Sequence, residues 1–216
     1  MSLVSSNPMQ ATAEWLRDRV GCLTASQAYP VLVMGARGKP LKARQDLIDK
    51  LVTERLTGEA EQCFVSDAMK WGIEHEEEAR NAYLDRAGQP LLDLVGFIRH
   101  PSIPCLGASP DGLINDEGLV EIKCPNTCTH IRRIAAGVVP DEYKPQMLVQ
   151  LLCTGRTWVD FVDYDPRLLE RHPKAALWVI RYTPTAEELE TAERLCREFL
   201  AEVDAATAAL VKALEA

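Results

Sequence analysis

At residues 107–125 the chain reads GASPDGLINDEGLVEIKCP, and this segment places three polar groups where a strand is usually apolar or solvated. Asp111 follows a Ser-Pro pair, and further along Glu121 and Lys123 flank Ile122. Side chains two residues apart on a strand point to the same face, so Glu121 and Lys123 should project together while Ile122 turns into the core. Two carboxylates and a lysine that converge in this way predict a chemical site.

The composition indicates one globular domain that spans residues 1–216. The chain is 47% hydrophobic, which suits a single domain with a substantial core. No basic-then-apolar leader opens it, and its apolar runs are far shorter than the ~20 residues that a bilayer span requires. Seven scattered cysteines, an odd number, argue against the disulfide framework of a secreted protein. We expect a soluble cytoplasmic protein, in a bacterium or a phage-infected host, with no membrane partner.

The charge of the chain gives no general sign of a nucleic-acid partner. The net charge is −8 and the sequence pI is near 5.1, so a global basic field is excluded. A local basic surplus lies between Arg37 and Arg55. It is either a solvated helix face or a surface that follows phosphates.

Hydrophobic periodicity and turn residues predict an α/β or α+β fold, in which helices flank a central mixed sheet and a long helix stands at the C-terminal end. The first three strands follow one another closely, which favours an antiparallel meander. Thr183 is the expected N-cap of the last helix, with Pro184 at its first position. Helices are expected over residues 10–19, 41–56, 67–87, 126–136, 142–153 and 184–214, and strands over residues 91–100, 104–112, 118–125, 157–164 and 177–182.

Two further segments offer polar groups. Thr24 is a plausible N-cap, with Ser26 and Gln27 in the turn that follows. This is either a routine cap or an anion site, since exposed N–H groups, a hydroxyl and the nearby Arg19 suit a phosphate. On the helix over residues 67–87, Glu76 lies on the same face as buried positions and could carry an inward carboxylate.

The central segment has the groups that phosphodiester hydrolysis with a divalent cation needs. Carboxylates suit Mg²⁺ or Mn²⁺, and the Ile122 carbonyl offers a further oxygen ligand. Lys123 can orient a water molecule and offset developing charge. Glu76 could complete a second metal position. The plainer alternatives are a turn at Asp111-Gly112 and an ion pair of Glu121 with Lys123 on an exposed strand.

Five spaced motifs resemble those of the phage lambda exonuclease family of viral recombination nucleases. These nucleases belong to the restriction-endonuclease-like superfamily with the PD-(D/E)xK signature. The motifs run in order along about two thirds of the chain. They are RVGCLTAS at residues 19–26, WGIEHEEEAR at 71–80, SPDG at 109–112, EIKCP at 121–125 and YDPR at 164–167.

The resemblance implies a role for each matching position. It implies a restriction-endonuclease-like core and two magnesium ions per site, with manganese as the alternative. The metal would be bound by Asp111, Glu121, Ile122 and Glu76, and Lys123 would be the catalytic lysine. The 5′-phosphate of a DNA end would be bound by Arg19, Ser26, Ser109 and Gln146, with Gln150 as a competitor for the last role, and Arg37 would contact the duplex.

The family also implies an activity and partners. The resemblance implies a homotrimeric ring that encloses linear double-stranded DNA and degrades one strand from its 5′ end. The 3′ single strand left behind serves recombination beside a single-strand annealing protein. A closed ring would reconcile the acidic pI with DNA binding, because basic groups could line the channel.

Three alternatives stay open at this point. A Cas4-like or helicase-associated nuclease of the same superfamily would carry an iron–sulfur cluster, but only Cys196 lies beyond Cys153. A catalytically inactive DNA-end-binding protein would lack an acid or the lysine, and all are present. Cys124, Cys128 and His130 suggest zinc, although a fourth ligand at sensible spacing is missing.

Overall fold

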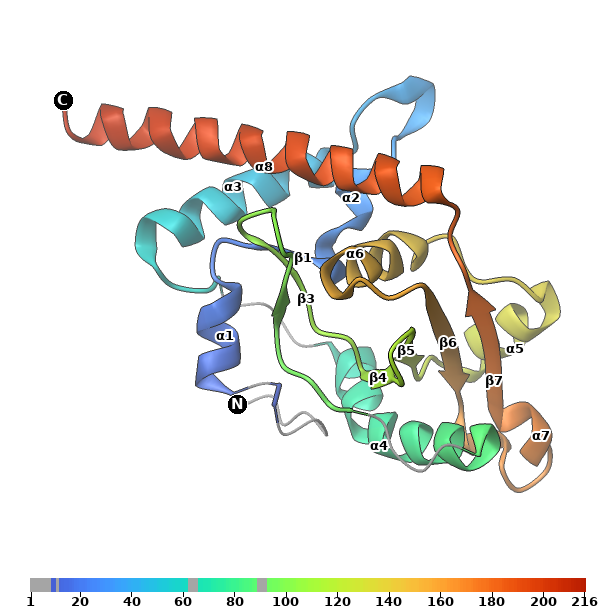
Figure 1. The fold of residues 1–216 in the computed structure, drawn as a ribbon. Coiled ribbons are helices and arrows are strands. Elements are labelled where there is room, and N and C mark those ends of the chain that lie inside the picture. Colours follow the sequence, from blue (N-terminus) through green and yellow to red (C-terminus); the bar gives the residue numbers. More distant parts are fainter. Residues whose placement is uncertain (1–8, 11, 62–65, 89–92) are drawn as a thin grey trace.

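The structure is a computed structural model that describes residues 9–10, 12–61, 66–88 and 93–216 (Figure 1). Its N-terminal part contains α1 (Ala13–Arg19), β1 (Leu23–Thr24), the 3₁₀ turn η1 (Ala25–Gln27), α2 (Tyr29–Leu32), the 3₁₀ turn η2 (Ala36–Gly38) and α3 (Lys42–Thr57). The middle contains α4 (Asp67–Ala87), β2 (Ile98–Arg99), β3 (Leu106–Ala108), β4 (Gly112–Ile114) and β5 (Gly118–Lys123). The last part contains α5 (Thr127–Ala136), α6 (Lys144–Thr154), β6 (Trp158–Tyr164), η3 (Pro166–Leu168), α7 (Pro173–Ala176), β7 (Leu177–Tyr182) and α8 (Ala186–Leu214).

Several helices begin where a side chain can satisfy the free backbone groups, and several end at a glycine. Thr12, Ser66 and Asn126 are the N-caps of α1, α4 and α5, and each side chain accepts a hydrogen bond from the backbone of the first turn. Gly88 ends α4 with φ +62°, a left-handed conformation that glycine adopts without steric cost. Local sequence therefore fixes most helix boundaries to within a few residues of the predicted ones.

The strands form two sheets, so the predicted single meander is wrong. One sheet has the order β1-β3-β2 and the other has the order β4-β5-β6-β7. The chain leaves the first sheet after β3 and enters the second at β4, through residues 109–111. Pro110 lies in this link and has no N–H with which to continue a ladder. Only residues 98–99 of the strand expected over 91–100 are strand, and residues 91 and 92 lie outside the described part of the chain.

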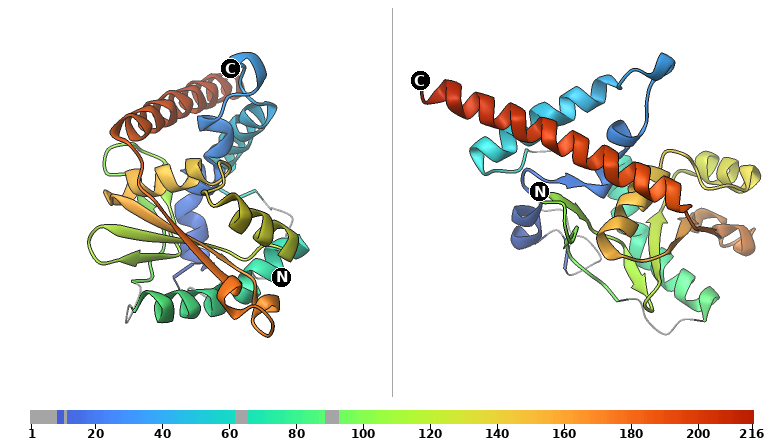
Figure 2. Two further views of the ribbon diagram at one scale, coloured as in Figure 1. Left: turned by 90° about the vertical axis from the view of Figure 1, so that its right-hand side faces the viewer. Right: turned by 45° about the horizontal axis from the view of Figure 1, so that its top comes forward.

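The second sheet has helices on both faces (Figure 2). Its strand β5 runs parallel to β6, and α5 and α6 form the crossover between them. On one face Val120 and Ile122 of β5 pack with Ala79 and Tyr83 of α4. On the other face Leu119 packs with residues of α6 and β6. Both faces of β5 are therefore inside the protein.

A third core lies under α8, beside α2 and α3 (Figure 1). The N-cap of α8 is Thr185 rather than the predicted Thr183, because Thr185 and Glu188 form a capping box in which each side chain accepts a bond from the other's backbone N–H. Phe199 and Val203 are buried, while residues 208–216 are all exposed. Helical spacing predicts buried positions at Leu56 and Met69 as well, but both side chains are exposed. No helix in the described ranges is long and apolar enough to cross a membrane.

Candidate active site

A cleft of about 530 Å³ opens at the carboxyl end of β5, where α4 and α6 approach each other. Four of the predicted catalytic side chains line it together, two from β5, one from α4 and one from the link before β4. The lining residues that matter for its chemistry are Glu76, Asp111, Glu121, Lys123, Arg133, Tyr143 and Gln146. Residues predicted from widely separated motifs thus meet in one place.

Glu121 is the most enclosed of these groups, with 1% of its side chain exposed. It points toward α6, where Gln146 Nε2 donates to its Oε1 at 2.7 Å and Gln150 Nε2 donates to its Oε2 at 2.5 Å. Lys123 Nζ lies 2.5 Å from Oε1. The same-face prediction for Glu121 and Lys123 holds, but the strand is buried rather than exposed.

Asp111 is hydrogen-bonded to the backbone of β5, the strand that carries Glu121. Its Oδ2 accepts a hydrogen bond of 2.7 Å from the backbone N–H of Ile122. Burial raises the pKa of Asp111 well above its ordinary value, and the nearby carboxylates of Glu121 and Glu76 raise it further, against the opposing effect of Lys123. The cleft therefore concentrates negative charge that its lysine only partly offsets.

Lys123 is the exposed member of the pair, with 27% of its side chain accessible. Burial alone would lower its pKa, but the carboxylates of Glu121 and Asp111 raise the pKa above the ordinary lysine value. The ring of Tyr143 lies 5.2 Å from Nζ, close enough for a cation–π contact. Tyr143 is held in turn by Arg133, whose Nη2 donates to the tyrosine hydroxyl at 2.8 Å.

Glu76 enters the cleft from α4 with 20% of its side chain exposed. Its Oε1 lies 2.6 Å from Nη2 of Arg80, one turn along the same helix. Ala79 and Tyr83, the residues predicted to share its face, are buried. The helix therefore presents Glu76 to the cleft as its periodicity predicted.

The donors fit a hard divalent cation by their chemistry. Carboxylates of Asp111, Glu121 and Glu76 are the ligands that Mg²⁺ and Mn²⁺ prefer. Burial, together with the nearby carboxylates of Glu121 and Glu76, raises the pKa of Asp111, and a bound cation would favour the ionised form of this group. No three His, Cys, Asp or Glu side chains of the described residues already lie in position to hold one ion. Both oxygens of Glu121 accept hydrogen bonds from amide groups of α6.

A second polar group lies just before Asp111. Ser109 Oγ accepts a hydrogen bond of 2.9 Å from Trp15 Nε1 and one of 3.4 Å from Arg19 Nη1. The Arg19 guanidinium also stacks on the Trp15 ring at 4.0 Å from its centroid. Trp15 was not among the predicted site residues, although its position four residues before Arg19 on one helix face is a signal that could have indicated the contact.

Ser26 lies at the same end of the first sheet as Ser109. Thr24 pairs with Gly107 in the parallel ladder of β1 and β3, and Ser26 and Ser109 each lie two residues beyond. Thr24 is the N-cap, as predicted, and forms a capping box with Gln27, but the turn that follows is a three-residue 3₁₀ helix. Ser26 is exposed, and its Oγ lies 3.3 Å from the Thr24 hydroxyl.

The remaining two predicted residues are elsewhere. Gln146 contacts Glu121 and so belongs to the acidic cleft rather than to the Ser109 group. Arg37 lies in an exposed loop closed by a bridge between Met34 and Pro40, and has φ +62°. The structure leaves Arg37 apart from the residues that line the cleft.

The cysteine alternatives gain no support. His130 is fully buried, and both ring nitrogens face acceptors, Asp163 Oδ1 at 2.6 Å and the Ala175 carbonyl at 2.7 Å. Neither nitrogen is available for zinc. Burial raises the pKa of Cys124 to about 12, which disfavours the thiolate that a metal needs. Cys63 lies outside the described residues, and no metal-binding group of cysteines occurs within them.

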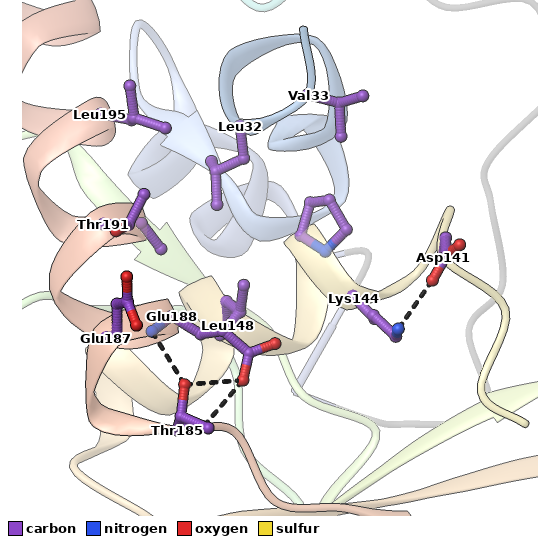
Figure 3. A pocket seen from close by; sticks show the side chains of 12 residues that line it. Leu32, Val33, Asp141, Lys144, Leu148, Thr185, Glu187, Glu188, Thr191 and Leu195 are labelled. Carbon is purple, nitrogen blue, oxygen red and sulfur yellow. Dashed lines mark hydrogen bonds and ion pairs between the residues drawn. The ribbon is translucent and has the colours of Figure 1, made fainter.

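Another hollow, of about 380 Å³, lies between α2, α6 and α8 (Figure 3). Leu32, Leu148 and Leu195 project toward it, and Lys144 pairs with Asp141 at its rim at 2.7 Å. None of the predicted site residues lines this hollow.

Comparison with known proteins gives the fold a class. Two crystal structures of LHK-Exo, an alkaline exonuclease from Laribacter hongkongensis, one of them in complex with dAMP, are 39% identical. They match with a TM-score of 0.85 over 94% of this chain and 98% of theirs. A phage-related exonuclease from Haemophilus somnus 129PT shares the fold at 14% identity, with a TM-score of 0.67 over 88% of this chain and 96% of that one. The mixed α/β core with its long C-terminal helix is thus an exonuclease fold.

The model of the YqaJ-like viral recombinase domain matches residues 14–157, which include the whole cleft. The chain belongs to this family of viral recombinases, and the resemblance to the phage lambda exonuclease family is confirmed. No curated protein matches the sequence.

Proposed function

We propose that this protein is a 5′-to-3′ exonuclease that degrades one strand of linear double-stranded DNA and leaves 3′ single strands for recombination by strand annealing. The observation that carries the proposal is the meeting of Asp111, Glu121, Lys123 and Glu76 in one cleft. Homology to an alkaline exonuclease supports nuclease chemistry there.

Two Mg²⁺ ions, or Mn²⁺ in their place, would be held by the carboxylates of Asp111, Glu121 and Glu76 and by the carbonyl of Ile122. When bound, the metal lowers the pKa of water and neutralises charge on the phosphate. The protein contributes rigidity, because the Ile122 N–H holds Asp111 in place and α6 holds Glu121. It also contributes negative potential, which attracts the cations.

Lys123 acts by position and charge. A lysine is ordinarily protonated at neutral pH, with a pKa of about 10.4. Its ammonium group can donate to an attacking water molecule and offset the charge that develops on the phosphate. Contacts with Glu121 and the Tyr143 ring limit where it can go.

Arg19 and Ser109 bind the 5′-phosphate of the DNA end. The Ser109 oxygen accepts from both Trp15 and Arg19, so its own hydroxyl hydrogen is left to donate to an anion. Ser26 adds a hydroxyl from the same sheet edge, and Gln146 reaches from the cleft side. Arg37, on its exposed loop, contacts the duplex by charge.

The working form is a homotrimeric ring that encloses DNA and acts beside a single-strand annealing protein. The chain is acidic overall, with a net charge of −8. A ring allows the acidic surface to face outward while Arg19 and Arg37 face the DNA.

The test is digestion of a 5′-phosphorylated linear duplex with Mg²⁺ by the wild type and by Lys123→Ala. We expect the wild type to remove one strand from its 5′ end and Lys123→Ala to lose at least about 100-fold in rate. Lys212→Ala, an exposed lysine near the end of α8, is the control and should digest like the wild type. Equal rates for the wild type and Lys123→Ala would refute the role of Lys123, and circular DNA cut as fast as linear DNA would refute exonuclease action.

A further inference from the structure

A second glutamine of α6, Gln150, lies beneath the cleft against Glu121. Its side chain is fully buried, and its Nε2 lies 2.5 Å from Glu121 Oε2. A carboxylate only accepts hydrogen bonds, so the amide nitrogen must be the group that faces it. Gln150 follows Gln146 by one helical turn, which places both amides on the face of α6 that meets β5.

The two glutamines hold different oxygens of the same carboxylate. Gln146 contacts Oε1, the oxygen that Lys123 also approaches, and lines the cleft. Gln150 contacts Oε2 and is absent from the cleft lining. Glu121 therefore has one oxygen on the open side and one oxygen held from below.

The amide oxygen of Gln150 indicates what the residue is for. Within the described part of the chain, Gln150 Oε1 is buried and has no hydrogen-bond partner. A buried acceptor without a partner is unfavourable, and an apolar side chain of similar length would avoid it. The amide at this position is accounted for by its donor, which is bound to Glu121.

We infer that Gln150 is a positioning residue for the metal-binding carboxylate. It fixes Glu121 Oε2, so that Oε1, which Gln146 and Lys123 approach, would be the oxygen that binds a divalent cation in place of Gln146. The displaced Gln146 amide is then free to bind the DNA phosphate. This division of roles rests on the proposed function, because it assumes a cation at Glu121 and a phosphate at Gln146.

The experiment separates the two glutamines by two measurements. Binding of Mn²⁺ is measured by titration calorimetry on the DNA-free full chain, and the ratio of digestion rates on 5′-phosphorylated and unphosphorylated ends is measured separately. Gln150→Met should bind Mn²⁺ about 10- to 100-fold more weakly than the wild type and keep the 5′-phosphate preference. Gln146→Met should bind Mn²⁺ at least as tightly as the wild type. Its ratio of digestion rates on 5′-phosphorylated and unphosphorylated ends should fall about tenfold.

Two further variants guard against a trivial loss of structure. Gln150→Asn keeps an amide that is one methylene too short to reach Glu121, so it should weaken Mn²⁺ binding like Gln150→Met. Thr154→Val changes α6 one turn further on, where the hydroxyl donates only to backbone carbonyls of the helix, and should bind Mn²⁺ like the wild type. Thermal melting shows that each variant is folded.

The outcomes distinguish the inference from the proposed function. Wild-type affinity for Mn²⁺ in folded Gln150→Met and Gln150→Asn would overturn the inference and leave the nuclease proposal intact. Loss of Mn²⁺ binding in Gln146→Met as large as that in Gln150→Met would overturn the division of roles. A wild type that binds no Mn²⁺ would overturn the metal site itself, and the role of Gln150 with it.

Discussion

The Arg19 guanidinium is held on two sides, by the Trp15 ring at 4.0 Å and by Ser109 Oγ at 3.4 Å. An arginine restrained in this way loses less conformational entropy when it binds a phosphate. Arg19→Ala should therefore slow digestion of 5′-phosphorylated ends about tenfold or more, with a much smaller effect on unphosphorylated ends. Parallel rate measurements on the two substrates test this.

Arg17→Ala is the matched control for Arg19→Ala, because Arg17 is an exposed arginine on the same short helix. It should leave both rates near those of the wild type. If Arg19→Ala slows both substrates equally, the residue serves the fold or general DNA affinity, and the end-binding assignment is wrong.

Residue spacing predicted the charged side chains of the cleft but did not predict the hydrogen bonds that hold Glu121 in place. The alternation of Glu121 and Lys123 along a strand, and the helical face of Glu76, are local properties that sequence periodicity reports directly. The bonds from Gln146 and Gln150 to Glu121 depend on how α6 packs on β5. That packing follows from a crossover whose position local sequence does not specify.

At the scale of elements, a buried charge network ties α5 to the sheet and to α7. Asp163 of β6 accepts from His130 at 2.6 Å and from Arg133 at 2.7 Å, and His130 also donates to the carbonyl of Ala175. With acceptors at both ring nitrogens, His130 is held as the imidazolium. Burial alone would lower the pKa of His130, but these hydrogen bonds raise it above the ordinary value.

The free energy of unfolding should consequently fall as the pH rises. The folded-state pKa of His130 is above its unfolded value of about 6.5, so its stabilisation is complete below that pH and is lost as the pH passes the folded-state pKa. Each unit of difference corresponds to about 1.4 kcal/mol. His130→Gln should lose about 3 kcal/mol at pH 6 and show a flatter pH dependence, measured by urea unfolding between pH 6 and 9. Identical pH slopes for the two proteins would show that His130 is neutral in the fold.

Helix boundaries were predictable from the sequence, and strand pairing was not. Helices α3, α4, α5 and α8 follow from apolar periodicity and caps, and their predicted boundaries differ from the observed ones by two residues or fewer. The meander failed because closeness along the chain does not determine which sheet a strand joins. The parallel pair β5-β6 brings together residues separated by two helices, and its partners are set by the packing of those helices on the sheet.

At the scale of the whole molecule, the end of α8 extends beyond the body of the protein (Figures 1 and 2). Leu210 is 46% exposed and Leu214 is 77% exposed. Burial of these apolar side chains at an interface would stabilise an assembly. Light scattering during gel filtration should give a mass near 3 × 24.0 = 72.0 kDa for the proposed trimer. A mass of 24.0 kDa at micromolar concentration would contradict the ring.

The link between the two sheets has a consequence for how the enzyme would move along DNA. Ser109 contacts Trp15 and Arg19, and Asp111 lines the cleft, so in the proposed function only Pro110 would separate the residue that binds the terminal phosphate from a residue that binds the metal. If the proposed roles hold, the short link would set the distance between the bound terminus and the metal site. The size of the product, a mononucleotide or a longer fragment, would then depend on the length of this link, residues 109–111.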